Sequence, residues 1–412
     1  MATAVGIDLC SDYTELHIYG KEDTVSIPTV ICRDRDRENF SIGEEAYRKT
    51  LGGGSILVDK LLRLAMRNGT ATIGGTCYRG RALLSVFLKE ALSELLFPEE
   101  ETGTLAGELS ELVITVPALT EEATETVLSA VAPLGIPKER VHLIGHTEAM
   151  MYYVLRCDRE LYSSTVAVYN LSEEKLFYYE MKVIRGIRRQ SVAGEGAPME
   201  EGFSLDILKN EAGRKLGDNI LTAFAGRMMA KKNYSAVFLT GKGFETVSYF
   251  SKFCDLICRR RRVLSESGLF ARGASEAAQD RTRAESAFPY VFLCESRVAA
   301  DISMEVMTRV KEERVLLTAA GTPWMEAGGR IEVIPCQQDY IGIDIVPVDR
   351  SLKQKTVRIP LLGFPVRPDR CTKVQIELSF SSANKLKFCL RDNGFGDIFP
   401  GTGACIYEEI EI

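Results

Sequence analysis

The chain has 412 residues, a net charge of −6 and an isoelectric point near 5.5, with 45% hydrophobic and 26% charged residues. This composition is typical of a globular protein, and the length allows two or three domains. The acidic balance argues against nucleic acid as the main partner, and no apolar run approaches the roughly 20 residues of a membrane helix. The first residues lack a basic start and a long apolar run, so no secretion signal is expected.

Eleven cysteines are scattered along the chain without tight pairs. Scattered thiols are typical of a reducing compartment, so we expect a cytoplasmic protein. Cys254 and Cys258 are four residues apart and would share one face of a helix. A metal site needs more ligands than two, and the three histidines are far away in sequence, so no metal site is predicted.

The first half of the chain predicts a sheet interrupted by helices. Residues 4–20 alternate in polarity around a short polar turn, which indicates a hairpin. The run 59–96 has mostly helical spacing. An unbroken apolar strand at 111–117 is typical of strands buried on both faces, and Thr120 then caps a helix. Further elements are expected as extended chain at 24–34, a short strand at 141–144 and a helix at 146–157.

The second half begins with another hairpin, at 165–184. Helices at 205–232, 247–262 and 268–278 and a strand at 236–244 follow. After a polar segment at 279–286, about nine short strands separated by turn residues predict an all-β sandwich. We therefore expect a first domain at 1–280, divided near residue 164 into lobes of about 1–164 and 165–280, and a β-sandwich domain at 286–412.

Several short motifs in this order resemble one known family. They are VGIDL, VDKLLRL, ELVITVPALTEEATETVLSAVAPLGI, HTEAMMYYVL, AVFLTGKGF and, in the tail, IPLLGFPVRP and KLKFCLRDNGFG. The chain resembles DnaK-type heat-shock chaperones of the actin-like ATPase superfamily, and in particular a group of bacterial DnaK-like proteins. The resemblance implies an α/β, two-lobed, actin-like (ribonuclease H-like) ATPase fold with nucleotide between the lobes, followed by a sandwich similar to a chaperone's substrate-binding β domain.

The resemblance also implies roles for single residues. Asp8 matches the carboxylate that holds magnesium, usually through water, and Lys60 matches the lysine that orients the attacking water. Gly241 to Gly243 match the turn beside the adenosine. The positions that the resemblance assigns to a bound ATP or ADP with magnesium are Asp8, Ser11, Asn170, Gly241, Lys242, Gly243 and Gly273.

The phosphate-binding turns depart from the family's pattern. Cys10 replaces the glycine of the first turn, and because a left-handed cysteine costs about 1–2 kcal/mol, we expect a turn of another shape. In the second turn Asn170 replaces an aspartate, and Glu173 and Glu174 replace glycines. A carboxylate about 5 Å from a phosphate repels it by roughly 3 kcal/mol at an effective dielectric near 20. His146 stands next to where the family has a catalytic carboxylate, either as a general base or as a packing residue.

Three functions are open at this point. The first is a degenerate DnaK-like pseudoenzyme, a non-hydrolysing interaction or scaffold protein that binds a protein partner. The second is a divergent switch that still binds ATP or ADP. The third is a chaperone module that binds peptides without a helical lid. The loss of glycine and aspartate at both phosphate turns favours the first.

Overall fold

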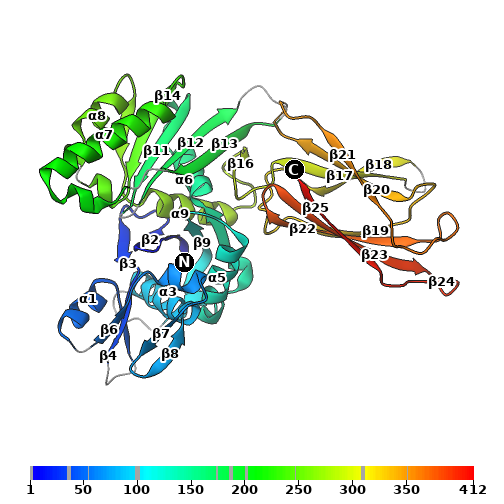
Figure 1. Ribbon diagram of the computed structural model, residues 1–412, viewed down its shortest axis with the longest axis horizontal. Coiled ribbons are helices and arrows are strands. Elements are labelled where there is room, and N and C mark those ends of the chain that lie inside the picture. Colours follow the sequence, from blue (N-terminus) through cyan, green and yellow to red (C-terminus); the bar gives the residue numbers. More distant parts are fainter. Residues whose placement is uncertain are drawn as a thin grey trace. The chain divides into compact units, whose positions relative to one another are not determined.

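The computed structural model describes residues 3–34, 39–53, 55–97, 103–172, 175–184, 189–199, 203–245, 247–307, 311–349 and 351–412 (Figure 1). The chain divides into two compact units. The first contains Met1–Arg185 and Val192–Pro289, and the second contains Gly186–Ser191 and Tyr290–Ile412. Among the described residues, none of the helices combines the length and the apolar run needed to cross a membrane.

A mixed five-stranded sheet forms the first half of unit 1. Its strands, in the order β10-β9-β1-β2-β3, are β10 (Val141–Gly145), β9 (Leu109–Val116), β1 (Thr3–Leu9), β2 (Tyr13–Ile18) and β3 (Thr24–Pro28). β1, β9 and β10 are parallel, whereas β1 with β2 and β2 with β3 are antiparallel. The hairpin predicted for the N-terminus and the buried strand before Pro117 are both confirmed.

Helices and two small sheets surround this sheet. The helices are α1 (Gly43–Leu51), α2 (Leu61–Met66), α3 (Gly80–Leu96), α4 (Leu105–Glu108), α5 (Glu121–Val131), α6 (His146–Arg156) and α9 (Leu269–Arg281). One small sheet contains β4 (Ile31–Asp34), β5 (Phe40–Ile42) and β6 (Ser55–Val58). The other contains β7 (Thr70–Ile73) and β8 (Thr76–Arg79). The expected Thr120 cap is confirmed, since its Oγ1 accepts from the Ala123 N–H at 3.1 Å.

The β7–β8 hairpin contradicts the helical expectation for 59–96. Its strands are joined by Gly74 and Gly75, which both have positive φ, 57° and 81°. A pair of residues with positive φ is the requirement of a tight two-residue hairpin turn. The two glycines therefore divide what the helical spacing had suggested was one mostly helical region.

A second mixed sheet forms the other half of unit 1. Within the unit its strands run in the order β15-β14-β11-β12-β13, with β15 (Arg262–Ser265), β14 (Tyr234–Thr240), β11 (Thr165–Leu171), β12 (Leu176–Ile184) and β13 (Ser191–Pro198). β11 and β12 form the second expected hairpin, while β11, β14 and β15 are parallel. The helices of this half are α7 (Glu211–Met228) and α8 (Ser251–Ile257).

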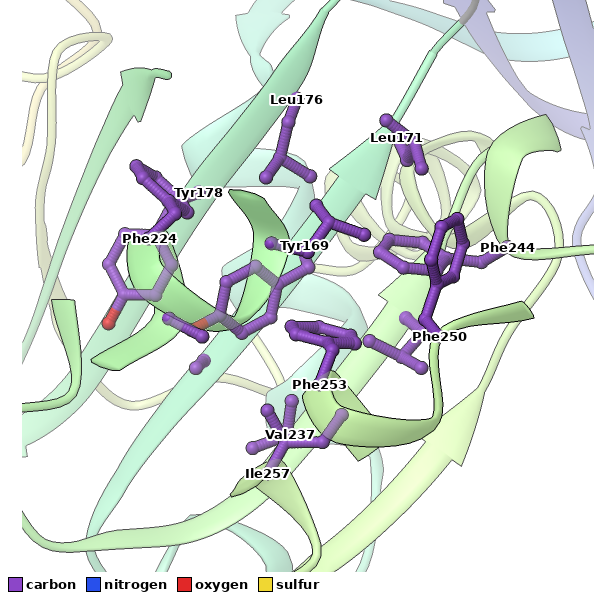
Figure 2. Packing of buried hydrophobic residues seen from close by; sticks show 14 of the residues in the cluster. Tyr169, Leu171, Leu176, Tyr178, Phe224, Val237, Phe244, Phe250, Phe253 and Ile257 are labelled. Carbon is purple, nitrogen blue, oxygen red and sulfur yellow. The ribbon is translucent and has the colours of Figure 1, made fainter. Parts of the chain in front are cut away.

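An aromatic core lies between the second sheet and its two helices (Figure 2). Tyr169 of β11 contacts Phe253 of α8 and Phe224 of α7 edge to face, with ring centroids 5.4 and 6.4 Å apart. Phe244, which follows β14, stacks on Phe253 at 5.8 Å and contacts Phe250 at 6.0 Å. The turn that ends β14 is therefore anchored in the core by its own phenylalanine.

The two sheets share one pairing pattern. Counting the strands given above for unit 1, each hairpin is extended by two parallel strands on the side of its first strand and by one further strand on the other side. Asp8 pairs with Thr115 of the neighbouring parallel strand, and Asn170 pairs with Thr240 in the same way. Each is the second-last residue of the first strand of its hairpin, so Asp8 and Asn170 occupy equivalent positions.

Helix α9 follows the second sheet in sequence but packs on the first. A Cβ on Gly6 of β1 would lie 2.2 Å from both Ala271 O and Ser275 N, so the strand and the helix touch backbone to backbone. His17 Nδ1 and Ser275 Oγ are 2.7 Å apart. Residues 165–280 were expected to form one lobe, but α9, which belongs to this range, packs on the first sheet. The small residues Ala271 and Ser275 of α9 allow this contact, because they fit against Gly6 of β1.

Unit 2 is all-β, as expected from the sequence. One sheet has the order β18-β17-β20-β21, with β18 (Glu312–Thr318), β17 (Ala300–Met307), β20 (Tyr340–Pro347) and β21 (Lys355–Pro360). The other has the order β19-β22-β23-β24 with β25 also on β23, from β19 (Gly329–Val333), β22 (Lys373–Ser382), β23 (Lys385–Phe395), β24 (Phe399–Pro400) and β25 (Cys405–Glu411). β16 (Val291–Leu293) begins this part of the chain.

A buried ion pair organises the tail motifs of unit 2. Both nitrogens of the Arg367 fork donate to the Asp392 carboxylate, at 2.6 and 2.8 Å, and the two side chains are 5% and 0% exposed. Asp392 also accepts from the Gly394 N–H and from Thr402. The guanidinium of Arg367 and these donors hold the pKa of Asp392 well below its usual range, against the effect of burial. The loop after β21 is thus fixed to the β23–β24 turn.

Candidate functional site

The candidate site lies where strands of unit 1 end. Asp8 is at the carboxyl end of β1, and His146 begins α6 directly after β10. In the second sheet Asn170 is at the end of β11 and Gly241 follows β14. Within each sheet the parallel strands present their carboxyl ends at one edge, where ligands of open α/β sheets usually bind, so that Asp8 lies beside His146 and Asn170 lies beside Gly241.

Asp8 is buried and engaged by its neighbours. His146 Nε2 lies 2.7 Å from Asp8 Oδ1, and the Cys10 thiol donates to the same oxygen at 3.4 Å. The residue is only 5% exposed. A carboxylate that holds a magnesium ion through water would need its oxygens open to that water. Burial and the hydrogen bonds to His146 and Cys10 leave little of the Asp8 carboxylate accessible.

His146 is held in one orientation by two aromatic residues. Its Nδ1 is 3.0 Å from the hydroxyl of Tyr179 on β12. Its ring stacks on Phe270 of α9, with centroids 3.9 Å apart and an interplanar angle of 9°. The side chain is fully buried. These contacts join α6, β12 and α9 around one imidazole.

The first turn does not have the shape of a phosphate-binding loop. The Cys10 N–H donates to Tyr13 O at 3.2 Å and closes the turn. Cys10, Ser11 and Asp12 all lack a positive φ, so the expectation of a turn of another shape is confirmed. Burial raises the pKa of the Cys10 thiol, and the carboxylate of Asp8 raises it further. Cys10 is therefore held as a thiol and is not activated as a nucleophile.

The G-K-G turn contacts both hairpins. Lys242 Nζ lies 2.8 Å from the centre of the Tyr13 ring. Gly241 has a φ of 89°, and a Cβ there would lie 2.4 Å from Asn170 Oδ1. Lys242 and Gly243 also line an open pocket of about 250 Å³, together with Leu205, Leu208, Lys209, Arg214 and Tyr249. The turn thus brings Asn170, Gly241 and Lys242 next to the first hairpin.

Two further expected site residues, Ser11 and Lys60, lie at or near the first turn. Ser11 is in the first turn, partly exposed. Lys60 has a left-handed backbone, with a φ of 50°, immediately before α2; its neighbour Leu61 donates to Thr29 O, and Thr29 in turn donates to Asp12 O. The Lys60 backbone is therefore close to the first turn.

Gly273 serves the packing of two helices. It is buried in α9, and a Cβ there would lie 1.9 Å from Ala149 O of α6. This contact explains the glycine without a ligand. The close approach of α9 to α6 also allows Phe270 of α9 to stack on His146 at the start of α6.

The second hairpin ends in a closed turn. The Ser172 N–H and hydroxyl both donate to Lys175 O at 2.9 Å, and the Lys175 N–H donates to Ser172 Oγ. Glu173 and Glu174, on which the repulsion argument depends, lie outside the described residues.

One group of potential metal ligands occurs among the described residues. The ligand atoms of Asp8, Cys10 and His146 all lie within 4.8 Å of one another. Cys254 and Cys258, which were considered from the sequence, are not part of it, and the Cys254 thiol instead faces Val247 O at 3.9 Å. The sequence offered one signal for the group, since Cys10 and His146 both stand where the resembled family has different residues.

Family models match almost the whole chain. Residues 12–295 match a family of unknown function (DUF5716), C-terminal part, and residues 297–412 match a domain of unknown function (DUF8552). The chain belongs to the DUF5716 family. No curated protein matches it. Neither description names an activity, and the boundary between the two DUF matches lies close to the boundary between the two units.

Proposed function

We propose that this DUF5716 protein is a non-hydrolysing, DnaK-like interaction protein with a two-lobed actin-like unit and a partner-binding β unit. The observation that carries the proposal is the position of Asp8, whose carboxylate is buried and hydrogen-bonded to His146 and therefore offers little surface to a magnesium–water shell. Asn170, at the equivalent position of the second sheet, has no negative charge to hold a metal.

The repeated sheet topology supports the two-lobed part of the proposal. Two halves with one strand order, each carrying a polar residue at the same strand end, are the arrangement that the resemblance implies. In that arrangement magnesium and phosphates would lie between the two hairpin turns. Here the turns lack the glycines that let N–H groups surround a phosphate, and Lys242 rests on Tyr13 instead. These residues do not fit a magnesium–triphosphate group.

Exposed apolar side chains in unit 2 support binding of a protein partner. Val366 and Leu362, in the loop after β21, and Ile398, in the turn between β23 and β24, are largely exposed. Arg367 connects the two segments, because it donates both to the Asp392 carboxylate and to Pro400 O. Apolar side chains on segments that are fixed by a buried ion pair can contact a partner with little loss of conformational entropy.

The first test is nucleotide binding. The purified protein is melted with and without millimolar Mg-ATP or Mg-ADP, and phosphate release is followed in parallel. We expect no release and no shift in Tm, whereas a ligand at 100 times its Kd would add about 2.7 kcal/mol to the free energy of unfolding. Hydrolysis above the buffer background, abolished by Lys60→Ala, would contradict the proposal.

The second test concerns the partner. The chain, the double variant Val366→Asp/Ile398→Asp and the control Leu51→Asp, which changes an exposed leucine of unit 1, are cross-linked in native extract. We expect one stoichiometric protein to be captured by the chain and by the control and lost from the double variant. Equal capture by all three proteins would show that Val366 and Ile398 of unit 2 do not bind the partner, and would contradict this part of the proposal.

A nucleotide-binding switch is the second candidate, and the pocket beside Lys242 favours it. The Arg214 guanidinium lies 4.2 Å from the centre of the Tyr249 ring in the wall of this pocket. A cation and an aromatic ring could bind a base and an anion without a magnesium site. Binding of ADP in chelator that Arg214→Ala removes would favour the switch over the interaction protein.

A further inference from the structure

Three side chains of different chemistry converge at the carboxyl ends of β1 and β10. Asp8 Oδ1 and His146 Nε2 are 2.7 Å apart, Cys10 Sγ is 3.4 Å from Asp8 Oδ1, and Cys10 Sγ is 3.9 Å from His146 Nε2. Ligands held by a tetrahedral zinc ion at about 2.0–2.3 Å are about 3.3–3.6 Å from one another. The observed triangle is close to this size: the Asp8–His146 edge must lengthen by roughly 0.6 Å and the Cys10–His146 edge must shorten by roughly 0.3 Å.

We propose that Asp8, Cys10 and His146 bind one zinc ion or a chemically similar transition-metal ion. The donor set contains one sulfur, one imidazole nitrogen and one carboxylate oxygen, which zinc accepts and magnesium does not prefer. Three protein ligands leave a fourth position for water. Cys10 is the most exposed of the three, so this position opens on its side of the cluster.

The surroundings of His146 are those of a metal ligand. When Nε2 binds the ion, Nδ1 carries the proton and donates to the Tyr179 hydroxyl, which lies 3.0 Å away. Ligating histidines almost always donate their second ring N–H to a fixed acceptor, and this contact orients the ring. Stacking on Phe270 restricts the same ring from its face.

The geometry does not fit a nucleophilic triad. In such a triad the carboxylate and the nucleophile contact opposite nitrogens of the histidine, so that the proton can pass through the ring. Here Asp8 and Cys10 both approach Nε2. The three ligand atoms lie within 4.8 Å of one another, and a cation is the ligand that all three can bind together.

Binding has a defined proton balance. The metal forms bonds to the Cys10 sulfur, the His146 Nε2 and an Asp8 oxygen, and the thiol proton leaves to solvent as the thiolate forms. The proton on Nε2 moves to Nδ1 by exchange with solvent if the ring is neutral. The affinity for metal therefore rises with pH.

The full-length chain, purified without a histidine tag and treated with chelator, is titrated with Zn²⁺ against a chromophoric chelator and separately with Co²⁺. We expect one equivalent to bind, with a thiolate-to-cobalt charge-transfer band. Cys10→Ser and His146→Gln should each weaken binding by about 100-fold or more, whereas Cys77→Ser, at an exposed thiol of β8, should leave it unchanged.

Tyr179→Phe keeps the ring and removes only the hydroxyl, so it tests the site even if the ligand variants fail to fold. It should weaken binding by about 10-fold. The proposal is overturned if the chain binds no stoichiometric metal, or if binding survives both Cys10→Ser and Tyr179→Phe, which would assign the metal to other thiols. The test is independent of nucleotide, so its outcome is separate from that of the proposed function.

Discussion

The two sheets of unit 1 share a topology but end in different chemistry. In the first sheet Asp8 pairs across the hairpin with Glu15, so two carboxylates occupy opposite strand positions. In the second sheet the equivalent Asn170 pairs with Phe177. The first strand end therefore pairs two carboxyl groups, and the second pairs a neutral amide with an aromatic ring. The aromatic core of the second half lies on the other face of this hairpin, where Tyr169 and Tyr178 point (Figure 2). One strand order can thus support a polar cluster in one half and apolar packing in the other.

The helices that cover the two sheets differ in the same sense. α9 lies against the first sheet through a backbone contact that requires Gly6 on the strand, and against α6 through a backbone contact that requires Gly273 on α9. α7 and α8 cover the second sheet through large side chains such as Tyr169 and Phe253. The first half is close-packed by small residues, and the second is filled by rings. Each half should therefore respond differently to a change in side-chain size.

The largest effect is expected for Gly6→Val. Val168 stands at the equivalent position of the second sheet and has room for its side chain, but a Cβ on Gly6 would meet Ala271 O and Ser275 N at 2.2 Å. Because backbone atoms cannot move away cheaply, we expect the free energy of unfolding to fall by more than about 4 kcal/mol. Urea denaturation measures it. A loss below about 1 kcal/mol would show that α9 does not require this glycine.

The next largest effect is expected for Asp8→Asn, which places in the first sheet the residue type that Asn170 supplies at the equivalent position of the second sheet. The carboxylate accepts from His146 and Cys10 in a buried site, and hydrogen bonds to charged groups contribute about 1.5–3 kcal/mol. In chelator we expect a loss of about 2–3 kcal/mol by urea denaturation. Asp59→Asn, at an exposed aspartate, is the control and should change stability by less than about 0.5 kcal/mol. Equal effects of the two changes would mean that Asp8 is not engaged.

Much of this comparison was predictable from local sequence pattern. Both hairpins, the buried strand ending at Pro117 and the Thr120 cap depend on neighbouring residues, and the structure confirms them. The all-β tail was predictable for the same reason, since its alternation and turn residues are local.

What could not be predicted depends on contacts between distant residues. Asp8 and His146 are separated by 138 positions, and no periodicity connects them. The packing of α9 on the first sheet and on α6 depends on Gly6 and Gly273. Nothing in the sequence near these glycines shows that β1, α6 and α9 come into backbone contact there. The β7–β8 hairpin was missed for another reason, because helical spacing on both sides of Gly74 and Gly75 hid a local turn.

A smaller effect is expected from the pH dependence of Glu15. Burial, the carboxylate of Asp8 and, more weakly, that of Glu245 raise its pKa, while Lys242 and Arg272 lower it, and together they bring the pKa of Glu15 to about 7. The folded chain thus keeps Glu15 protonated where the unfolded chain has already ionised it. Its contribution to stability is complete below about pH 4.5 and is lost as the pH rises to about 7.

Glu15→Gln tests this titration, measured in chelator by urea denaturation at pH 5, 6, 7 and 8. Glutamine does not ionise, so the variant should gain stability relative to the chain as the pH rises, by on the order of 1–2 kcal/mol at pH 8 after screening by solvent. Phe177→Leu, at the equivalent position of the second sheet, should produce a difference that does not change with pH. A constant difference for Glu15→Gln as well would contradict the charge difference between the two strand ends.

The smallest effect is expected for Gly226→Ala, which tests whether α7 tolerates a larger side chain better than α9 does. Gly226 is an exposed glycine of α7 on the second sheet, and a Cβ there would meet nothing within 4 Å. Gly226→Ala should therefore raise the free energy of unfolding by about 0.5 kcal/mol, because alanine loses less backbone entropy in a helix. Gly273→Ala on α9 is the matched change, and its methyl group would overlap the Ala149 carbonyl. If both alanines stabilise the chain, the glycine contacts of the first half do not set its packing, and the difference between the two halves lies only in the polar cluster.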